Sequence, residues 1–277
     1  MAVLNVVRTV GGLSRPSGTE MFRQGDLSVW AREGGWSIVV SQRAVADVDV
    51  HGNTNLCLVD ADLDTVQVAD SVVLVVALAI IERVQGWFHV HAGLVVDDAV
   101  GATLVVGESG AGKTTTTLGL AARGRLGCDD VVFVQPGADG ICARAFVRPL
   151  HVGAATLAMF PALQERLGNG RSQAGKLIVS VDEGEAESDV ALRVSLLVFP
   201  AIDNRATTVA ESLTPSEVLP RLLRASAMVA WPCLPHAAEH LDSLVKLSRL
   251  PARALHLGRD ALVDPACIAR ALHSVRA

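Results

Sequence analysis

A glycine-rich segment at residues 107–114, with the sequence GESGAGKT, lies between an apolar run at 102–106 and a helix-forming run at 113–123. It matches the pattern G-x-x-x-x-G-K-[ST], the P-loop, and it has the strand before and the helix after that this pattern needs. Glycines let backbone N–H groups turn toward phosphates, and the helix directs its positive end at them. Lysine and threonine add a charge and a magnesium ligand. The segment therefore predicts a nucleoside triphosphate site, with ATP and Mg²⁺ as the expected cofactors.

The residues expected to contact ATP are Gly107, Glu108, Ser109, Gly110, Ala111, Gly112, Lys113, Thr114 and Thr115. Such a site also needs carboxylates, and Asp129 and Asp130 follow Lys113 by sixteen and seventeen residues, directly before an apolar strand. One carboxylate can hold magnesium together with Thr114, and the other can accept a proton from an attacking hydroxyl. Two adjacent aspartates are otherwise typical of an exposed turn, but the spacing after the P-loop favours a site.

His89 and His91 lie two residues apart in an expected strand, so their side chains point to the same face of the sheet. Two histidines on one face could ligate a metal ion. Alternatively, one faces the phosphates or the acceptor and the other is packed in the core. The sequence places no third metal ligand beside them, which favours the second interpretation.

The chain before the P-loop predicts a separate β-rich lobe. Residues 1–68 contain alternating or apolar segments, such as those at 27–31 and 36–40, divided by glycines. Residues 70–84 are good helix formers, and Gly86 stands where a helix C-cap is expected. We therefore expect two domains, a β-rich N-terminal lobe at 1–84 that ends in a helix and a P-loop domain at 85–277.

From residue 87 the pattern becomes α/β. The capping-box sequence at Thr214-Pro215-Ser216-Glu217 predicts a helix start, and Asp264-Pro265 predicts a last helix to about Arg276. The expected strands are 87–91, 94–96, 102–106, 131–134, 177–181 and 194–199, the last of them closed by Pro200.

Composition excludes several classes of protein. The longest apolar run, residues 72–81, is about half of what spans a bilayer, and the N-terminus has no export signal, so we expect a cytoplasmic protein without a membrane partner. The five cysteines are scattered and odd in number, as suits reduced thiols. Residues 221–277 hold eight Arg/Lys against four Asp/Glu, which can attract an anionic partner. No basic patch interleaved with aromatic residues is present, so nucleic acid is not an expected partner.

The order of these motifs resembles the C-terminal catalytic domain of HPr kinase/phosphorylase, and more closely its shorter relatives that accompany peptide-modification and other biosynthetic genes. The resemblance rests on the histidine-containing strand at 88–96, the P-loop, Arg123-Gly124 at the helix end, and Asp129-Asp130. It covers residues 85–150 firmly and reaches more weakly to about residue 258. It implies an α/β P-loop kinase domain of the HPr kinase/PEP carboxykinase-like type, a mixed sheet flanked by helices.

The activity that the resemblance implies is transfer of the γ-phosphoryl group of ATP to a seryl or threonyl hydroxyl of a peptide or protein, for example a biosynthetic precursor peptide. Asp129 matches the acid/base aspartate, Asp130 its neighbour on the metal side, and His91 the active-site histidine. Lys113 would neutralise the transferring group. The resemblance also implies a homo-oligomer.

The sequence departs from the bifunctional enzymes in two respects. Thr115 stands where those enzymes have Glu, and their downstream E-[IV]-R-G signature is absent. The phosphorylase reaction, and HPr as the substrate, are therefore not expected. Arg148 precedes Pro149, and the short relatives have an Arg-Pro step at the same place. Arg148 either contacts the phosphates or the acceptor, or has a structural role. Arg171 and Lys176 flank a glycine-rich loop, for which a solvated basic loop is favoured over closure on the nucleotide.

Two other functions stay open from the sequence. The acceptor can be a small molecule with a hydroxyl group, since no residue separates this alternative from a peptide. A non-catalytic nucleotide-binding regulator also needs only the P-loop. An ABC-type ATPase is disfavoured because the chain has no LSGGQ-like helix start.

Overall fold

The 277-residue chain is described here from a computed structural model. The structure describes residues 4–8, 16–40, 44–58, 72–97, 101–161, 172–173, 176–179, 191–203, 205–226 and 234–274. By packing, the chain divides into two compact units: unit 1 comprises Met1–His89 and Ala227–Leu241, and unit 2 comprises Val90–Ser226 and Asp242–Ala277. The expected domain boundary between residues 84 and 85 stays a prediction.

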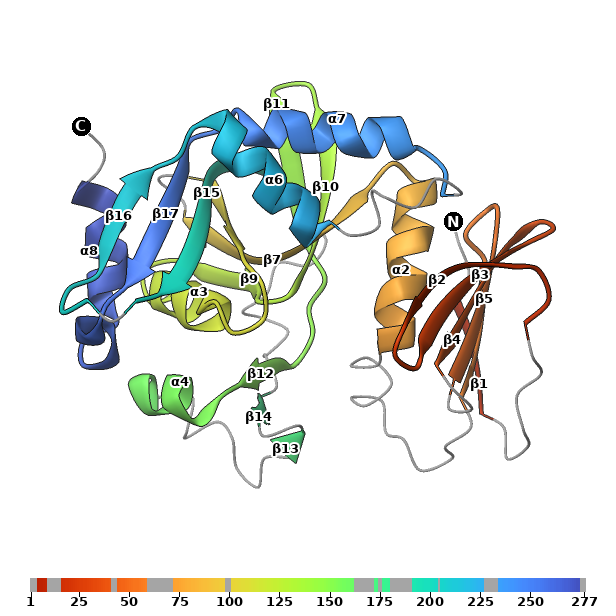
Figure 1. The fold of residues 1–277 in the computed structure, drawn as a ribbon, viewed down its shortest axis with the longest axis horizontal. Helices are drawn as coiled ribbons and strands as arrows, with labels where there is room; N and C mark the ends of the chain where they lie inside the picture. Colours follow the sequence, from red (N-terminus) through yellow and green to blue (C-terminus); the bar gives the residue numbers. More distant parts are fainter. Residues whose placement is uncertain are drawn as a thin grey trace. The chain divides into compact units, whose positions relative to one another are not determined.

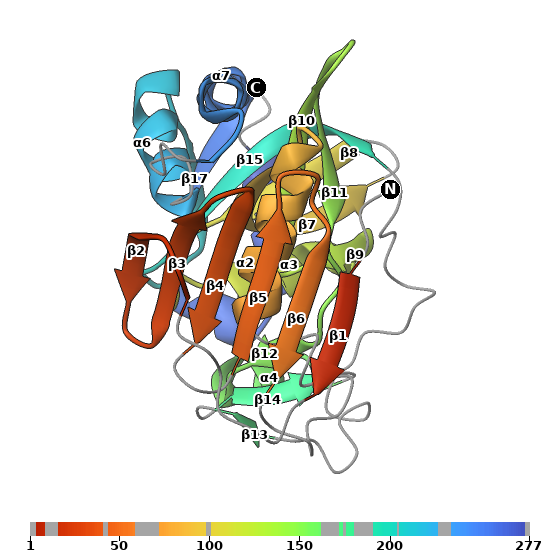
Figure 2. The same ribbon diagram turned by 90° about the vertical axis from the view of Figure 1, so that its right-hand side faces the viewer.

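Unit 1 is built on a mixed sheet with the strand order β1-β6-β5-β4-β3-β2 (Figure 2). Strands β2 to β6 pair with their neighbours in antiparallel fashion, and β1 joins β6 in parallel at the edge. Helix α2 packs on one face of the sheet, against β4, β5 and β6. The bounds are β1 Leu4–Arg8, β2 Thr19–Gln24, β3 Leu27–Arg32, β4 Gly35–Val40, β5 Ala44–Asp49, β6 Thr54–Leu58 and α2 Val72–Val84.

Alternation along the strands explains this packing. Every second residue of β5, namely Ala44, Ala46 and Val48, is buried. Because successive side chains in a strand point to opposite faces, these residues line one face. Ile80 and Ala77 of α2 are likewise completely buried. The predicted β-rich N-terminal segment followed by a helix is confirmed at this level.

Unit 2 contains a larger mixed sheet, in which the order within the described residues is β11-β10-β7-β8-β15-β17-β16 and β9 pairs with β7 (Figure 1). Strands β8, β15 and β17 are parallel, whereas β7 and β16 run antiparallel to their neighbours β8 and β17. The strand bounds are β7 Phe88–Asp97, β8 Gly101–Val106, β9 Arg125–Cys128, β10 Val131–Gly137, β11 Gly140–Ala145, β15 Leu192–Ile202, β16 Val209–Ser212 and β17 Ala252–Leu257. β7 begins in unit 1.

Helices flank this sheet, and a small antiparallel sheet with the order β12-β14-β13 completes the unit. Helix α3 packs against α8, α8 packs against β16 and β17, and α6 packs against β8. α7 begins in unit 1 and continues in unit 2. The bounds are α3 Lys113–Ala121, β12 Leu150–Val152, α4 Ala154–Met159, β13 Ser172–Gln173, β14 Lys176–Val179, α6 Pro215–Ala225, α7 Ala237–Ser248, η2 Arg259–Leu262 and α8 Ala266–Ser274.

The central strand β8 is buried from Ala102 to Val106 and apolar there except for Thr103, as expected for a strand covered on both faces. Its carboxyl end leads into the glycine-rich loop at residues 107–112, which α3 follows directly. The expected mixed α/β sheet with flanking helices is therefore confirmed. The predicted capping box of α6 is also present, with Thr214 at the N-cap and Glu217 at N3.

Two strand predictions were wrong. The strands expected at 87–91 and 94–96 are one continuous strand, β7, because Ala92 and Gly93 pair with β8 like their neighbours. Pro200 does not close β15, which runs on to Ile202. The predicted residues 180–181 of the strand at 177–181, and 275–276 of the last helix, lie outside the described residues. None of the described helices is long and apolar enough to cross a membrane.

Candidate functional site

The glycine-rich loop turns sharply before α3. Gly110 and Gly112 have φ values of 84° and 94°, in the left-handed region that favours glycine. A Cβ atom on Gly112 would lie 2.5 Å from Cδ1 of Leu257, so the buried Leu257 side chain would have to shift in addition to the strain that the backbone conformation imposes. At Gly110 and Gly112 the loop therefore has a backbone conformation that other residue types rarely adopt.

Lys113, the first residue of α3, is buried and lies among carboxylate and carbonyl oxygens. Its Nζ donates to the backbone oxygen of Asp129 at 3.2 Å and to Oδ1 of Asp130 at 3.4 Å. A buried ammonium group is costly unless it is paired, and these contacts supply the pairing. The structure thus brings Lys113 and the two aspartates together, as the sequence analysis expected.

Asp129 is buried, with 5% of its surface exposed, in the turn between β9 and β10. Its Oδ2 accepts a hydrogen bond from Oγ1 of Thr114 at 3.2 Å. Burial, together with the neighbouring charge of Asp130, raises the pKa of Asp129 to about 6, although Lys113 and Thr114 act in the opposite direction. The exposed-turn alternative is therefore wrong for Asp129, whose carboxyl group titrates in a range suited to proton exchange near neutral pH.

Asp130 has a different environment, because three basic side chains surround it. Nδ1 of His91 lies 3.1 Å from Oδ1, Nζ of Lys113 lies 3.4 Å from the same oxygen, and a terminal nitrogen of Arg148 lies 3.0 Å from Oδ2. Burial works to raise the pKa of Asp130, but these three neighbours outweigh it and the pKa is lowered. Asp130 is thus an ionised carboxylate at neutral pH.

His91 lies on β7, and its side chain contacts Asp130. Burial lowers the pKa of His91, Lys113 and Arg148 lower it further, and the attraction of Asp130 does not compensate. The ring is therefore neutral at neutral pH, and its contact with Asp130 is a hydrogen bond rather than an ion pair. Nδ1 also lies 3.1 Å from the backbone oxygen of Asp130, so the proton belongs on Nδ1.

The other predicted residues have separate positions. Oγ1 of Thr115 lies 2.8 Å from Oγ1 of Thr156 on α4. Lys176 lies exposed at the start of β14, and Arg171 lies outside the described residues. No group of three or more potential metal-ligating side chains of His, Cys, Asp or Glu occurs in the described ranges.

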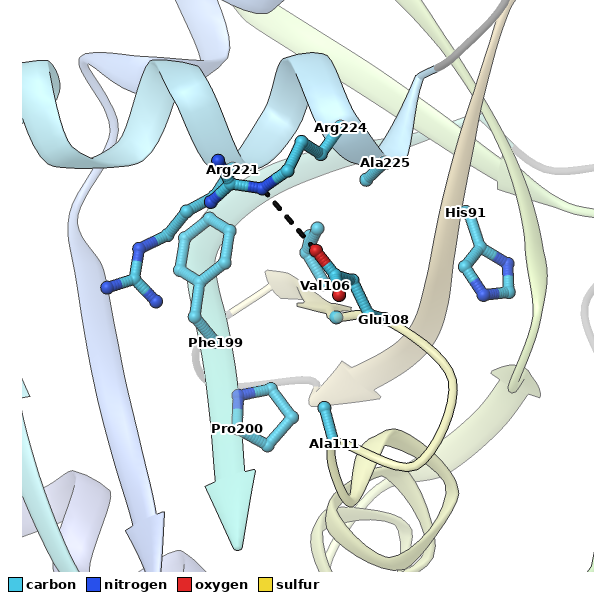
Figure 3. A pocket seen from close by; sticks show the side chains of 10 residues that line it. His91, Val106, Glu108, Ala111, Phe199, Pro200, Arg221, Arg224 and Ala225 are labelled. Carbon is cyan, nitrogen blue, oxygen red and sulfur yellow. Dashed lines mark ion pairs between the residues drawn. The ribbon is translucent and has the colours of Figure 1, made fainter.

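A cavity of about 210 Å³ borders the glycine-rich loop. Figure 3 shows His91 at one side of it, Glu108 and Ala111 of the loop below, and Arg221 and Arg224 of α6 above. Nε of Arg224 lies 3.5 Å from Oε1 of Glu108. The lining is completed by Val106, Gly107, Phe199, Pro200 and Ala225.

The two arginines and Thr156 were missed by the sequence analysis. Arg221 and Arg224 stand about one hundred residues after the P-loop, and only the basic balance of residues 221–277 pointed to this part of the chain. A closer signal existed, because Val218 and Leu222 are the buried side of α6 and the two arginines occupy other positions of the same helix. Thr156 carries no signal in the sequence.

Comparisons with known proteins add little to this description. No family model matches the sequence, and no curated protein matches it. Among solved structures, the Hpr(Ser) kinase/phosphatase from Coxiella burnetii is similar, with 16% identity over 68% of this chain and 90% of that chain. The TM-score of this match is 0.36.

Proposed function

We propose that this protein is an ATP- and magnesium-dependent kinase that transfers the γ-phosphoryl group to a seryl or threonyl hydroxyl of a peptide or protein. One observation carries the proposal: at the start of α3, Lys113 contacts both Asp129 and Asp130, and Thr114 contacts the buried carboxylate of Asp129. The carboxylate of Asp130 has three basic partners. Phosphoryl transfer needs a positioned charge on the phosphates, a magnesium ligand and an acceptor for the hydroxyl proton. This cluster contains residues for each role.

The residues present fit the cofactor. Gly110 and Gly112 have left-handed backbone conformations and no side chains that would stand between the loop and a phosphate. Lys113 and the hydroxyl group of Thr114 follow them directly. Residues 107–115 would hold the phosphates of ATP, and Thr114 with one carboxylate would hold Mg²⁺. When bound, magnesium ATP supplies the phosphoryl group and much of the charge that offsets it.

Each side chain then has a defined task. Lys113 neutralises phosphate charge from a fixed position, because Asp129 and Asp130 hold its Nζ. Asp129 accepts the proton of the attacking hydroxyl, and Asp130 lies on the metal side, as proposed from the sequence. His91 and Arg148 fix the carboxylate of Asp130.

The contact between Thr114 and Asp129 favours a second assignment of the two carboxylates. A magnesium ion held by Thr114 would lie next to Asp129, and Asp130, whose partner His91 lines the cavity, would then face the acceptor. A magnesium titration of the variants Asp129→Asn and Asp130→Asn separates the two assignments. The metal ligand is the residue whose replacement raises the magnesium concentration needed, and the base is the one whose replacement abolishes turnover at any magnesium concentration.

The first experiment measures ATP binding and transfer in Lys113→Ala and Asp129→Asn, with candidate acceptors followed by mass spectrometry. Lys113→Ala is expected to weaken ATP binding and abolish transfer, because the phosphates lose their fixed charge. Asp129→Asn is expected to keep ATP binding and lose turnover. Unchanged turnover in both variants contradicts the mechanism, and ATP binding without any transfer favours a nucleotide-binding regulator.

The size of the cavity favours one further candidate, a kinase for small molecules. At about 210 Å³ it is smaller than the roughly 300–1,000 Å³ of sites for drug-sized ligands. It suits a metabolite or a single side chain. The mass gain of one phosphate on a peptide or on a metabolite decides between these acceptors.

A further inference from the structure

We infer that the cavity beside the glycine-rich loop binds the phosphoryl acceptor, and that Arg221 and Arg224 recognise an anionic group of this acceptor, a carboxylate or a phosphate. This inference rests on the proposed function, because it assigns the acceptor side of the same site. It names a class of substrate, hydroxyl compounds or residues that carry a negative charge a few bonds from the hydroxyl.

The position of the cavity supports an acceptor site. Lys113 marks where the β- and γ-phosphates are expected, and its Nζ lies 3.4 Å from Asp130. Asp130 in turn contacts His91 at 3.1 Å, and His91 lines the cavity. The cavity therefore lies next to the cluster of side chains at which the transferred group is expected. A hydroxyl at the His91 side would be close to that end.

The opposite side of the cavity is basic. The guanidinium carbon of Arg221 lies 5.6 Å from the centre of the Phe199 ring, so the guanidinium is held over the aromatic face. A planar group held in this way presents its N–H edge to a partner. Arg224 lies one turn along the same helix, and both arginines line the cavity. Figure 3 shows the side chain of Arg224 above Glu108 and that of Arg221 extending past the ring of Phe199.

Glu108 indicates which kind of group the arginines accept. Its carboxylate lies 3.5 Å from Nε of Arg224, but its side chain is 78% exposed and that of Arg224 is 61% exposed. Ion pairs at such exposed positions are weak and exchange readily. A carboxylate or phosphate of an acceptor can therefore take the place of Glu108 at Arg224, with Arg221 as a second positive charge in the lining of the same cavity.

The remaining walls limit the size of the acceptor. Val106, Phe199, Pro200 and Ala225 give the cavity an apolar surface between its two polar sides. Within about 210 Å³ this surface accommodates only a short carbon skeleton. The arrangement thus fits a hydroxyl at the His91 side, a few carbon atoms, and an anion at the arginine side.

Ligand-observed NMR with the full chain, without nucleotide, tests the inference with three probes. 3-Hydroxypropanoate and 2-hydroxyethyl phosphate carry the two anions, and 3-hydroxypropanamide is the neutral match of the first. We expect both anions to bind and the amide to bind at least tenfold more weakly. Tighter binding of the phosphate probe than of the carboxylate probe would mark an acceptor that carries a phosphate.

Variants locate the binding and exclude a general charge effect. Arg221→Gln and Arg224→Gln are each expected to weaken anion binding about tenfold with unchanged ATP affinity. Arg249→Gln, an exposed arginine that does not line the cavity, is the control and should change neither. Glu108→Gln should strengthen anion binding about two- to fivefold, because the resident carboxylate no longer competes.

Three results would overturn the inference: no binding of either anion by the wild type, equal binding of the acid and the amide, or an equal loss of ATP affinity in the arginine variants. The last result would assign the cavity to the nucleotide. Lys113→Ala separates this test from that of the proposed function, since it should lose ATP binding and keep anion binding. Anion binding that depends on the arginines, in a protein that transfers no phosphate, would contradict the proposed function alone.

Discussion

Asp129 and Asp130 are adjacent in the sequence, but the fold treats their carboxylates in opposite ways. Asp129 is buried beside a single hydroxyl donor, and burial raises its pKa to about 6. Asp130 meets His91, Lys113 and Arg148, which outweigh burial and lower its pKa. Ionisation of Asp129 therefore destabilises the folded state, whereas ionisation of Asp130 stabilises it.

This difference predicts opposite effects of two matched variants on stability. At pH 8 in the presence of a chelator, Asp129→Asn should raise the free energy of unfolding by about 2 kcal/mol, because a buried carboxylate is replaced by a neutral amide. Asp130→Asn should lower it, because three basic groups lose their charged partner. Urea unfolding measures both. A change in the same direction in the two variants would contradict the environments described here.

At this scale the sequence could predict which residues meet, but not how each is buried. The spacing from Lys113 to Asp129 sufficed to bring these side chains together, because a short helix and one strand connect them. The burial of Asp129 depends on β7, β9 and β10 packing around it, which no local pattern encodes. The contact of Arg148 with Asp130 is of the same kind, since either role of Arg148 was compatible with the sequence.

Among the elements, α3 depends on a close approach to α8. A Cβ atom on Gly119, in the last turn of α3, would lie 2.7 Å from Cδ1 of Ile268, which is completely buried. Glycine in a helix normally costs about 1 kcal/mol relative to alanine. The glycine is accepted here because it allows the two helices to pack closely, which in turn holds the start of α3 beside the glycine-rich loop.

A double-mutant cycle tests this contact. Gly119→Ala should destabilise the protein in spite of the better helix propensity of alanine, and Ile268→Val should cost about 1 kcal/mol for the lost methyl group. In the double variant the clashing Cδ1 is absent, so the free energy of unfolding should be higher than additivity predicts by about 1 kcal/mol or more. Additive effects, or stabilisation by Gly119→Ala alone, would show that the approach of α3 to α8 is not tight.

Pro200 shows why strand ends were predicted less well than strands. Leu197 and Asp203 donate their N–H groups to the backbone oxygens of Pro251 and Leu257, at the start and end of β17, so the odd-numbered residues of β15 face that strand. Pro200 therefore faces the β8 side, where the last paired residues are Val198 and Val105. Beyond them the missing N–H of proline interrupts no ladder. Only the register of the neighbouring strand, which lies far away in the sequence, reveals this.

At the scale of the whole molecule, unit 1 draws on a second stretch of chain, residues 227–241, that the sequence analysis did not associate with it. Within the described residues, Arg83 of α2 makes the connection. Its Nε donates to the backbone oxygen of Pro235 at 2.6 Å, and one terminal nitrogen lies 2.6 Å from Nδ1 of His240. His240 also stacks on Phe88, with ring centroids 4.9 Å apart. Nothing near either segment in the sequence indicates this pairing.

The pairing predicts that unit 1 loses stability in acid. Burial, the charge of Arg83 and His89 lower the pKa of His240 to about 3, against 6.5 for an ordinary histidine. The unfolded state therefore binds the proton first, so the contribution of His240 to stability is complete above about pH 6.5 and declines as the pH falls toward 3. Each pH unit in this window should cost at most about 1.4 kcal/mol. Unfolding of the full chain in urea, followed by hydrogen exchange in α2 and at residues 234–241, measures this slope.

The variant His240→Gln is the control, because its side-chain oxygen can still accept from Arg83 but does not titrate in this range. It should be less stable than the wild type at pH 7, where the stacking on Phe88 is lost, and the two proteins should approach each other in stability as the pH falls. Exchange in unit 2, where Cys128 and Val132 lie in a core that lacks His240, should not follow the same pH dependence. A pH slope that is identical in the wild type and the variant would assign the acid sensitivity of unit 1 to its carboxylates, and Arg83 would then hold residues 234–241 through Pro235 rather than through the neutral ring of His240.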